Sequence, residues 1–386
     1  MMLGLLLARA GARVIVLEKH ADFLRDFRGD TLHPSTLEAL HDLGYLEELL
    51  KRPHQKASHL RGVIGDRAVT VADFSALPVH APYIAFMPQW DFLAFLAEKA
   101  RAYPTFQLRM EAEVRGLVID AGRVTGVEVK TPDGEFVVSS RLVVGADGRG
   151  SRVREAAGLR VRDYGAPIDV LWFRLPRLAG DTGETLGRFE PGSLMILINR
   201  ETYWQCGYVI PKGEFEEIRR DGLDALRERI ARTTPFLKDG LHELADWDRI
   251  KLLTVKVDRL ERWYRDGLLC IGDAAHAMSP VGGVGINFAV QDAIATARIV
   301  AGPLRLGTLT TSDLAQVEKR RAWPAALMQR LQIFIHRHVI YHVLKKDREK
   351  PLSLPWPLRL LDAFPLLRRL PGRLIGMGFR PERIDG

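Results

Sequence analysis

Cysteine is nearly absent from the sequence, with only Cys206 and Cys270 among 386 residues and no CxxC pair. This scarcity excludes a zinc ribbon and a disulfide framework, because both need several cysteines at short spacing. Apolar runs are also short, and none reaches the roughly 18 residues that a membrane-spanning helix needs. The apolar start, Met1 to Leu7, lacks the basic segment of a signal peptide. We therefore expect a protein of the reducing cytoplasm.

No long run of lysine or arginine occurs either, although 56 Lys and Arg against 48 Asp and Glu give a formal net charge of +8. A scattered excess of this kind favours small anionic ligands, such as phosphates or carboxylates, and argues against nucleic acid as a partner. No spacing of metal-ligating residues is apparent. The chain is longer than the about 250 to 300 residues at which single domains usually split, so we expect two lobes.

The first pattern that is present is a helix followed by a buried strand. Leu- and Ala-rich residues from Met2 to Ala10 stop at Gly11, and the β-branched run from Val14 ends in Glu18. This order is typical of the second half of a βαβ nucleotide-binding unit, where an acid at the strand end binds a ribose. Arg28 follows, and its planar guanidinium suits a pyrophosphate. A solvated strand end and a surface charge are the alternatives for these two residues.

The second pattern is GADGRGSRVR, residues 145–154, directly after the apolar strand Leu142 to Val144. Its three glycines allow the backbone to turn tightly and a ligand to approach closely. Asp147 can orient that turn and reach a ligand through water. An ordinary strand-to-helix turn is the alternative.

The third and strongest pattern follows the apolar residues Leu268 to Ile271. Gly272 and Asp273 come at the end of this strand, where α/β sheets bind ligands. A glycine-rich bend then opens a helix whose N-terminus would direct free amides and a partial positive charge at the ligand. The alternative is a glycine-rich loop without a cofactor. His276 lies in the same stretch, and we expect it to be structural.

Together these segments resemble the class A flavoprotein monooxygenases, the family typified by para-hydroxybenzoate hydroxylase. GADGRGSRVR is similar to that family's DG motif, and IGDAAHAMSPVGGVGIN to the GD motif that contacts the flavin. The resemblance covers most of residues 1–310 and implies FAD as the cofactor, with NADH or NADPH as a transient reductant. The cofactor-binding residues it implies are Glu18, Arg28, Gln89, Asp147, Gly148, Gly272, Asp273, Pro280, Gly282, Gly283, Gly285, Ile286 and Asn287.

One element of the family pattern does not occur in the sequence. The family begins with a strand, a GxGxxG turn and a helix, whereas Met1 to Gly4 here already falls inside that helix. We expect either a true start roughly 15 to 20 residues upstream, from the size of a βαβ unit, or a truncated product. Without the first strand, the parallel sheet would have a gap at its centre and FAD binding would weaken.

The predicted fold class is α/β, with a Rossmann-like FAD-binding domain, an inserted and mostly antiparallel sheet domain, and a helical C-terminal region. The predicted boundaries are 1–62, 88–165 and 262–312 for the FAD-binding domain, 63–87 and 166–261 for the substrate-binding sheet, and 313–386 for the C-terminal region.

The function that the resemblance implies is hydroxylation of an aromatic or polyketide-like compound by O2, through a flavin C4a-hydroperoxide. The small organic substrate is expected between the flavin and the inserted sheet. Trp172, Trp204 and Tyr208 are candidates for its wall, with simple core packing as the alternative for each. The sequence does not identify a catalytic base. It also leaves open whether the protein forms a homodimer.

The sequence suggests three alternative functions. A flavin halogenase is disfavoured, because the stretch from Cys206 to Pro211 has neither tryptophan of the halogenase WxWxIP motif. A flavin-dependent reductase of a prenyl or other lipid-like substrate stays open, as does an FAD-poor remnant without activity. The tail from Leu352 to Phe379 could lie on a membrane, but packing against the body or a dimer partner is the favoured expectation.

Overall fold

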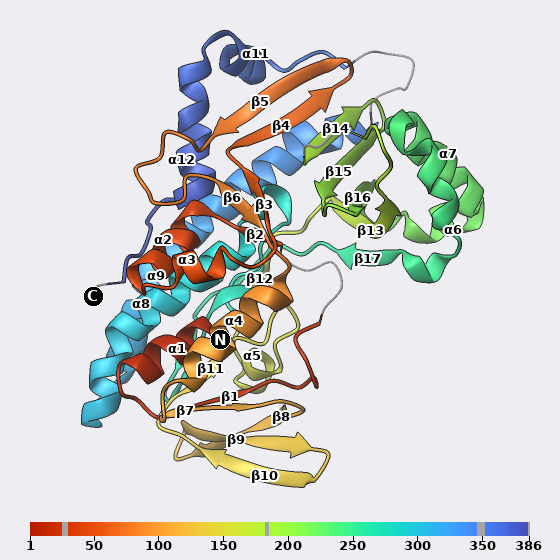
Figure 1. The fold of residues 1–386 in the computed structure, drawn as a ribbon. Helices are drawn as coiled ribbons and strands as arrows, with labels where there is room; N and C mark the ends of the chain where they lie inside the picture. Colours follow the sequence, from red (N-terminus) through yellow and green to blue (C-terminus); the bar gives the residue numbers. More distant parts are fainter. Residues whose placement is uncertain (25–29, 182–184, 346–351, 385–386) are drawn as a thin grey trace.

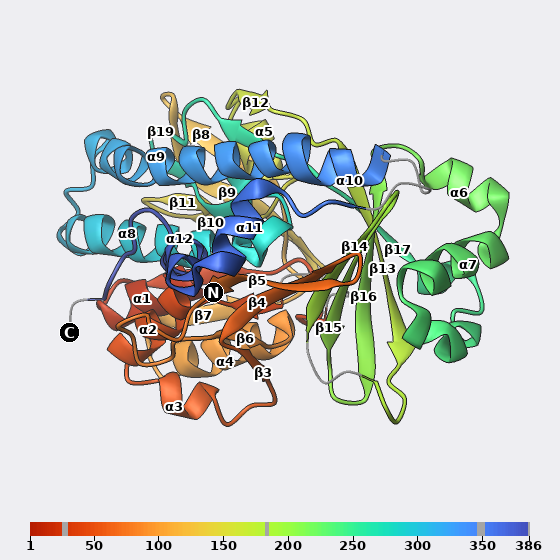
Figure 2. The same ribbon diagram turned by 90° about the horizontal axis from the view of Figure 1, so that it is seen from above.

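The computed structural model describes residues 1–24, 30–181, 185–345 and 352–384. Arg28, which the sequence assigned to a pyrophosphate, lies outside the described residues. Figures 1 and 2 show a body built around α1, α4, α8 and α9, and a large sheet at its side that carries α6 and α7 on its outer face.

Helices and strands alternate along most of the chain. The α-helices are α1 (Met2–Arg9), α2 (Pro34–Asp42), α3 (Leu46–Leu49), α4 (Gln89–Arg101), α5 (Arg152–Ala156), α6 (Phe215–Asp221), α7 (Leu223–Thr233), α8 (Gly285–Leu306), α9 (Thr311–Ile335), α10 (Tyr341–Lys345), α11 (Trp356–Ala363) and α12 (Arg369–Met377). The 3-10 helices are η1 (Pro235–Glu243), η2 (Trp247–Arg249), η3 (Gly272–Ala274), η4 (Val281–Gly283) and η6 (Pro365–Arg368), and η5 (His336–Ile340) is a π-helix.

The strands are β1 (Val14–Leu17), β2 (Thr31–Leu32), β3 (Gln55–Ala57), β4 (His59–Ile64), β5 (Arg67–Asp73), β6 (Ile84–Phe86), β7 (Phe106–Arg109), β8 (Glu113–Asp120), β9 (Arg123–Thr131), β10 (Gly134–Ser139), β11 (Val143–Gly145), β12 (Val161–Asp163), β13 (Ile168–Pro176), β14 (Leu186–Glu190), β15 (Ser193–Asn199), β16 (Tyr203–Pro211), β17 (Lys251–Thr254), β18 (Asp258–Leu260), β19 (Tyr264–Arg265) and β20 (Leu268–Cys270). They form six separate sheets within the described ranges.

The parallel strands of the body form two pairs that do not meet. β1 pairs with β7, and β11 pairs with β20, but no hydrogen bonds join β1 to β11 within the described part of the chain. Val14 and Val16 of β1 and Val144 of β11 line the same cavity. The expected gap in the parallel sheet is therefore present, and it explains why β1 is only half-buried.

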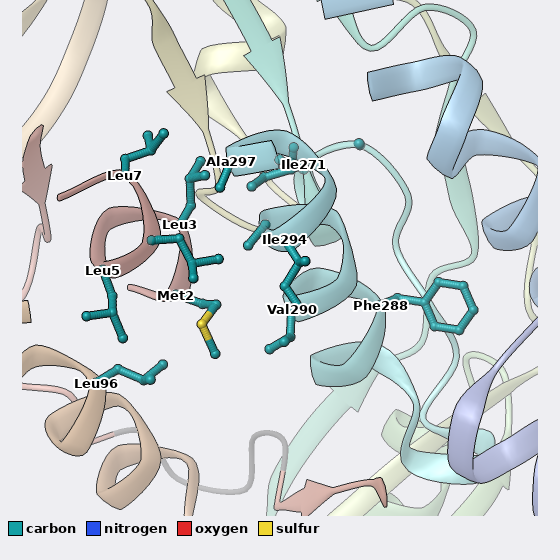
Figure 3. Packing of buried hydrophobic residues seen from close by; sticks show 14 of the residues in the cluster. Met2, Leu3, Leu5, Leu7, Leu96, Ile271, Phe288, Val290, Ile294 and Ala297 are labelled. Atoms are coloured by element: carbon teal, nitrogen blue, oxygen red, sulfur yellow. The ribbon is translucent and has the colours of Figure 1, made fainter. Parts of the chain in front are cut away.

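Helix α8 is the central element of the body and packs against α1 (Figure 3). Ile294 and Ala297 of α8 are buried, as is Leu5 of α1, and the short alanine side chains allow the two helices to pack closely. The stretch Val281–Leu306 is long and apolar enough to cross a membrane, but 67% of its most apolar window is buried inside the protein. It has the character of a core helix.

The largest sheet has the strand order β17-β13-β16-β15-β14-β4-β5 and is antiparallel except at the β14–β4 pair. Side chains alternate between its two faces, as strand geometry requires. Leu171 and Phe173 of β13 join the core beneath α7 and η1, whereas Val170 and Trp172 point to the other face, where the cavity lies. The sheet thus forms one wall of that cavity.

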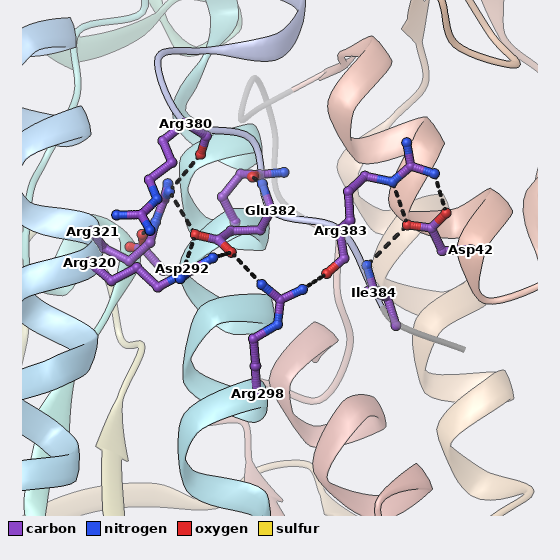
Figure 4. Close-up of polar contacts among 10 residues, drawn as sticks. Asp42, Asp292, Arg298, Arg320, Arg321, Arg380, Glu382, Arg383 and Ile384 are labelled. Atoms are coloured by element: carbon purple, nitrogen blue, oxygen red, sulfur yellow. Dashed lines mark hydrogen bonds and ion pairs between the residues drawn. The ribbon is translucent and has the colours of Figure 1, made fainter.

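The C-terminal region returns across the body and is fixed there at several points. α12 lies on β5 so closely that a side chain at Gly372 would meet the carbonyl oxygen of Asp73. Further along, the buried carboxylate of Glu382 pairs with Arg298 of α8 and Arg320 of α9 (Figure 4). The tail is therefore part of the folded body.

Candidate active site

A cavity of about 3340 Å³ lies between the parallel strands, the glycine-rich bend before α8 and the inner face of the seven-stranded sheet. It is several times larger than the about 300 to 1,000 Å³ of an ordinary small-molecule pocket. Most of the predicted cofactor residues are brought together at its wall: Glu18, Gln89, Asp147, Gly148, Gly272, Asp273, Pro280, Gly282, Gly283, Gly285 and Ile286. Asn287 is buried behind the bend, where its amide oxygen accepts a hydrogen bond from the hydroxyl of Thr36.

The turn after β20 presents a carboxylate to the cavity. Gly272 has a φ of +59° that favours glycine, and a side chain there would press on Ala289 of α8. Its amide donates to Oδ2 of Asp292 at 3.0 Å, so the turn is fixed from behind. The next residue, Asp273, projects forward and accepts from Nε of Arg149 at 3.2 Å.

The glycine-rich bend itself has an open inner surface. Gly282 and Gly283 both have positive φ, and the carbonyl of Gly283 accepts from the Thr31 hydroxyl at 2.7 Å. A Cβ atom on Gly283 would lie 2.5 Å from that hydroxyl oxygen, whereas one on Gly285 or Gly148 would meet nothing within 4 Å. The backbone is therefore exposed to a ligand at Gly285 and Gly148 and held by the protein at Gly283.

The segment with sequence GADGRGSRVR forms a capped turn. Asp147 accepts from the Ser151 hydroxyl at 2.5 Å and from the amide of Val153 at 3.1 Å, and thereby orients the turn as predicted. Arg154, which is buried, donates to Asp258 at 3.2 Å and to the carbonyl of Ala274 at 3.3 Å. This guanidinium ties the turn to the start of the bend, so the two motifs form one rigid rim.

A buried charged cluster supports the bend from below. Asp292 of α8 accepts from Nε2 of His276 at 2.5 Å and from Nε of Arg321 at 2.9 Å. Burial acts to raise the pKa of Asp292, but the charges and hydrogen bonds of His276 and Arg321 outweigh it and lower that pKa below its usual value. His276 therefore has the structural role that the sequence suggested.

A further carboxylate at the cavity, Asp30, was not predicted from the sequence. It is buried just before β2, and its Oδ2 atom accepts from Nε2 of Gln205 at 2.5 Å and pairs with Arg200 at 2.9 Å. Burial raises the pKa of Asp30, and the charge of Arg200 only partly offsets this. No short sequence motif could predict this cluster, because Asp30 and Gln205 lie 175 residues apart in the chain.

The three aromatic candidates for the substrate wall separate onto two faces of the sheet. Trp172 lines the cavity and packs over Gly207. Trp204 and Tyr208 share a face, as their alternation indicated, but it is the face covered by α7 and η1. On that face the indole nitrogen of Trp204 donates a hydrogen bond to Oδ2 of Asp181 at 2.8 Å. The structure thus corrects the expectation for these two residues, which form part of the outer core.

The cavity fits a flavin dinucleotide on the evidence of its own residues. It offers the Asp273 carboxylate to hydroxyl groups, the open backbone at Gly148 and Gly285 to a flat ring or a phosphate, and the half-buried Glu18 at the end of β1 to a ribose. A family model described as FAD binding domain matches residues 1–330. The chain belongs to this FAD-binding family.

Several relatives of the chain are named as monooxygenases. The 6-methylpretetramide 4-monooxygenase of Streptomyces rimosus is 33% identical over 344 residues, which is 88% of this chain and 81% of that protein. A 12-dehydrotetracycline 5-monooxygenase/anhydrotetracycline 6-monooxygenase of the same species is 30% identical over 76% of this chain, which spans only 59% of that protein. The predicted FAD-dependent monooxygenase, reduced by NAD(P)H as is general in the family, is confirmed.

Solved structures agree on the fold. The p-nitrophenol 4-monooxygenase PnpA from Pseudomonas putida superposes with a TM-score of 0.78 at 20% identity, and covers 98% of this chain and 95% of its own. OxyS anhydrotetracycline hydroxylase from Streptomyces rimosus gives 0.73 at 25% identity, over 97% of this chain and 73% of its own. The predicted α/β fold class with a helical C-terminal region is confirmed.

Proposed function

We propose that this monooxygenase hydroxylates a phenolic, multi-ring aromatic compound of the polyketide type. The observation that carries the proposal is that the Asp273 turn, the glycine bend and the apolar sheet face border one continuous cavity. Because the cavity is continuous from the Asp273 turn to the sheet face, it can take a dinucleotide beside an aromatic substrate, while its total volume of about 3340 Å³ also includes the gap between β1 and β11. The relatives from Streptomyces rimosus, which are named for tetracycline-type compounds, support the same substrate class.

The residues proposed to hold FAD follow from their positions on the cavity wall. Glu18 binds the ribose, Asp273 accepts hydrogen bonds from the ribityl chain, and the backbone of Pro280 to Gly285 borders the ring. The N-terminus of α8 would offer a partial positive charge to a flavin held at the bend, which would stabilise the negative charge of the reduced ring. When bound, FAD supplies the redox and oxygen-activating chemistry, which no side chain of the protein can provide.

The substrate is proposed to lie against the sheet. Trp172, Ile196 and Val209 form an apolar wall that excludes water from the aromatic rings. Asp30 lies at the edge of this wall, and its Oδ1 atom accepts no hydrogen bond from the residues that the structure describes. A phenolic hydroxyl at this position would donate to Oδ1, which orients the ring and increases its electron density for attack.

The proposed reaction also needs a reductant and a cellular location that supplies it. We propose that NADH or NADPH binds transiently, because the sequence contains no second dinucleotide motif. A cytoplasmic location would supply this reductant. The reducing cytoplasm also suits the two cysteines, which are free and buried. Burial raises the pKa of the Cys270 thiol to about 12, so this thiol is unreactive.

The test is oxygen incorporation. The purified chain is incubated with FAD, NADH or NADPH, heavy-isotope O2 and a tetracyclic phenol, and the products are analysed by mass spectrometry. We expect one heavy oxygen atom in the product, dependent on both FAD and reductant. Reduction of a prenyl double bond without oxygen uptake would support the reductase instead, and a chain that never binds FAD would support the inactive remnant.

A further inference from the structure

The C-terminal tail exposes an apolar stripe. Trp356 and Leu360 are spaced by four residues in α11, which places them on one side of the helix, and Phe364 follows directly after the helix end. Leu366 and Leu370 repeat this spacing at η6 and α12. All five are exposed, Trp356 to 76% and Leu366 to 69%. This orientation is the reverse of that in an ordinary surface helix, whose apolar side faces the core.

The stripe is held rigidly on the body. A side chain at Gly376 would lie 3.0 Å from Leu77 and 3.2 Å from Phe74, so the opposite side of α12 is seated tightly. Nδ1 of His33 is 2.9 Å from the carbonyl oxygen of Ile375, a hydrogen bond that links the same helix to α2. The exposed side chains therefore cannot turn inward without breaking these contacts, and they need an external partner to become buried.

The charge of the tail indicates what that partner is. Residues 352–381 contain one acid, Asp362, and five basic residues: Arg359, Arg368, Arg369, Arg373 and Arg380. Arg359, Arg369 and Arg373 are exposed beside the stripe. Two copies of so basic a surface would repel each other, whereas an anionic lipid surface attracts it. Apolar side chains and tryptophan beside arginines are also the composition of helices that lie in a membrane interface.

The tail also borders the mouth of the cavity. Pro355 and Pro357 line the cavity and are exposed, as are Phe334 and Tyr341 on the neighbouring end of α9 and on α10. These exposed lining residues mark one opening of the cavity, and others, such as Arg13 and Arg305, lie elsewhere on its rim. The apolar stripe therefore lies beside one opening of the cavity.

We propose that residues 356–373 bind an anionic membrane surface, with Trp356, Leu360, Phe364, Leu366 and Leu370 inserted among the lipids and the arginines at the headgroups. The protein is then a peripheral membrane protein whose cavity opens at the interface, where an apolar substrate concentrates. The tail packs against the body as expected, and the proposal adds a membrane contact on its outer side. The proposal does not depend on the function of the flavin site.

The experiment is vesicle flotation with the full chain. Vesicles of phosphatidylcholine alone are compared with vesicles containing phosphatidylglycerol, at low and high salt. We expect flotation only with the anionic vesicles, weakened by salt because surface charges are screened. Trp356→Ser with Leu366→Ser should lower the partition constant roughly tenfold or more, through the loss of apolar insertion. Arg369→Gln and Arg373→Gln should each lower it about fivefold.

Leu306→Ser provides the matched control, because Leu306 is exposed to the same 76% but lies at the far end of α8. It should float as the unchanged protein does, and all variants should keep their thermal midpoint. Failure of the unchanged protein to float with anionic vesicles at low salt would overturn the proposal, as would equal binding to both vesicle types. A dimer in gel filtration that the Trp356 and Leu366 substitutions dissociate would show that a second copy covers the stripe.

Discussion

Nε of Arg149 lies 3.2 Å from Oδ2 of Asp273, and this ion pair joins two turns that are 124 residues apart in the sequence. Both side chains are about one-third exposed and line the cavity. An exposed pair of this kind contributes little to stability, so its position at a ligand site is the more informative property. The pair orients the Asp273 carboxylate toward the proposed position of the ribityl chain.

Replacing Asp273 by alanine should therefore weaken FAD binding more than it weakens the fold. A hydrogen bond to a charged group contributes about 1.5 to 3 kcal/mol, which corresponds to roughly a 10- to 100-fold rise in the Kd for FAD. Titration followed by flavin fluorescence measures this change. Asp120→Ala, at an exposed strand end outside the cavity lining, is the control and should leave the Kd unchanged. An unaltered Kd in the Asp273 variant would remove this residue from the site.

Two glycines of the bend should respond differently to alanine. Gly283→Ala forces a side chain into a φ of +63° and against the Thr31 hydroxyl, so both thermal stability and FAD binding should fall. Gly285→Ala meets no protein atom, and it should lower FAD affinity while the apoprotein keeps its thermal midpoint. Thermal unfolding of both apoproteins, combined with FAD titration, separates the two effects. Equal stability of the two variants would contradict the proposed geometry.

Glu382 is expected to anchor the C-terminal segment. Its carboxylate is fully buried among Arg298, Arg320 and Arg321, and Glu382→Gln removes the charge that pairs with all three guanidiniums (Figure 4). Because Arg298 and Arg320 are 32% and 27% exposed and Arg321 keeps its pair with Asp292, the cost should lie below the about 3 to 5 kcal/mol of a fully buried pair. Arg383→Gln removes the ion pairs of a half-exposed guanidinium with Asp42 and with the buried Glu38, and it should cost less than Glu382→Gln because solvent screens the Arg383 charge. Urea unfolding compares the two, and similar losses would argue against the anchor.

Stability should fall between pH 6.5 and pH 5. Burial lowers the pKa of His33 and of His336 to about 4 in the folded protein, while both have the ordinary histidine pKa of about 6.5 in the unfolded chain. Below pH 6.5 the unfolded chain binds protons that the folded protein does not, so the free energy of unfolding drops by about 1.4 kcal/mol per pH unit for each histidine. His336→Gln should remove about half of this slope in denaturant melts. A stability that is constant over this range would contradict the buried neutral state.

Asp30 should matter for the phenolic substrate and little for the flavin. Asp30→Asn removes the charge that accepts the phenolic hydrogen bond, so hydroxylation should fall about tenfold or more while the FAD Kd is kept. Because burial raises the pKa of Asp30, hydroxylation should also decline as the pH falls through this raised pKa, where the carboxylate becomes neutral. Gln205→Leu removes one partner of the carboxylate and is the positioning control. Full activity of Asp30→Asn would exclude the role.

Local features of the site were predictable because a short sequence determines each of them. The strand end at Asp273, the positive-φ glycines and the turn at Asp147 follow from residue type and spacing, and the structure brings them to one cavity.

Features that depend on packing between distant segments were not predictable in this way. Alternation in β16 placed Trp204 and Tyr208 on one face, but only the position of α7 and η1 decides that this face is covered. The contact of Asp30 with Gln205 depends on how the sheet is docked on the body. The exposed stripe from Trp356 to Leu370 could not be told from a buried one, because periodicity alone does not show which side of a helix is covered.

The central claim is that the cavity behind Asp273 binds FAD, and equilibrium titration of the purified full chain with FAD tests it most directly. The account predicts saturable, stoichiometric binding with a shifted flavin absorption band and altered fluorescence, weakened in Asp273→Ala and unchanged in Asp120→Ala. Flavin that keeps the spectrum of the free cofactor at every protein concentration, in a chain shown to be folded by its thermal transition, would contradict it.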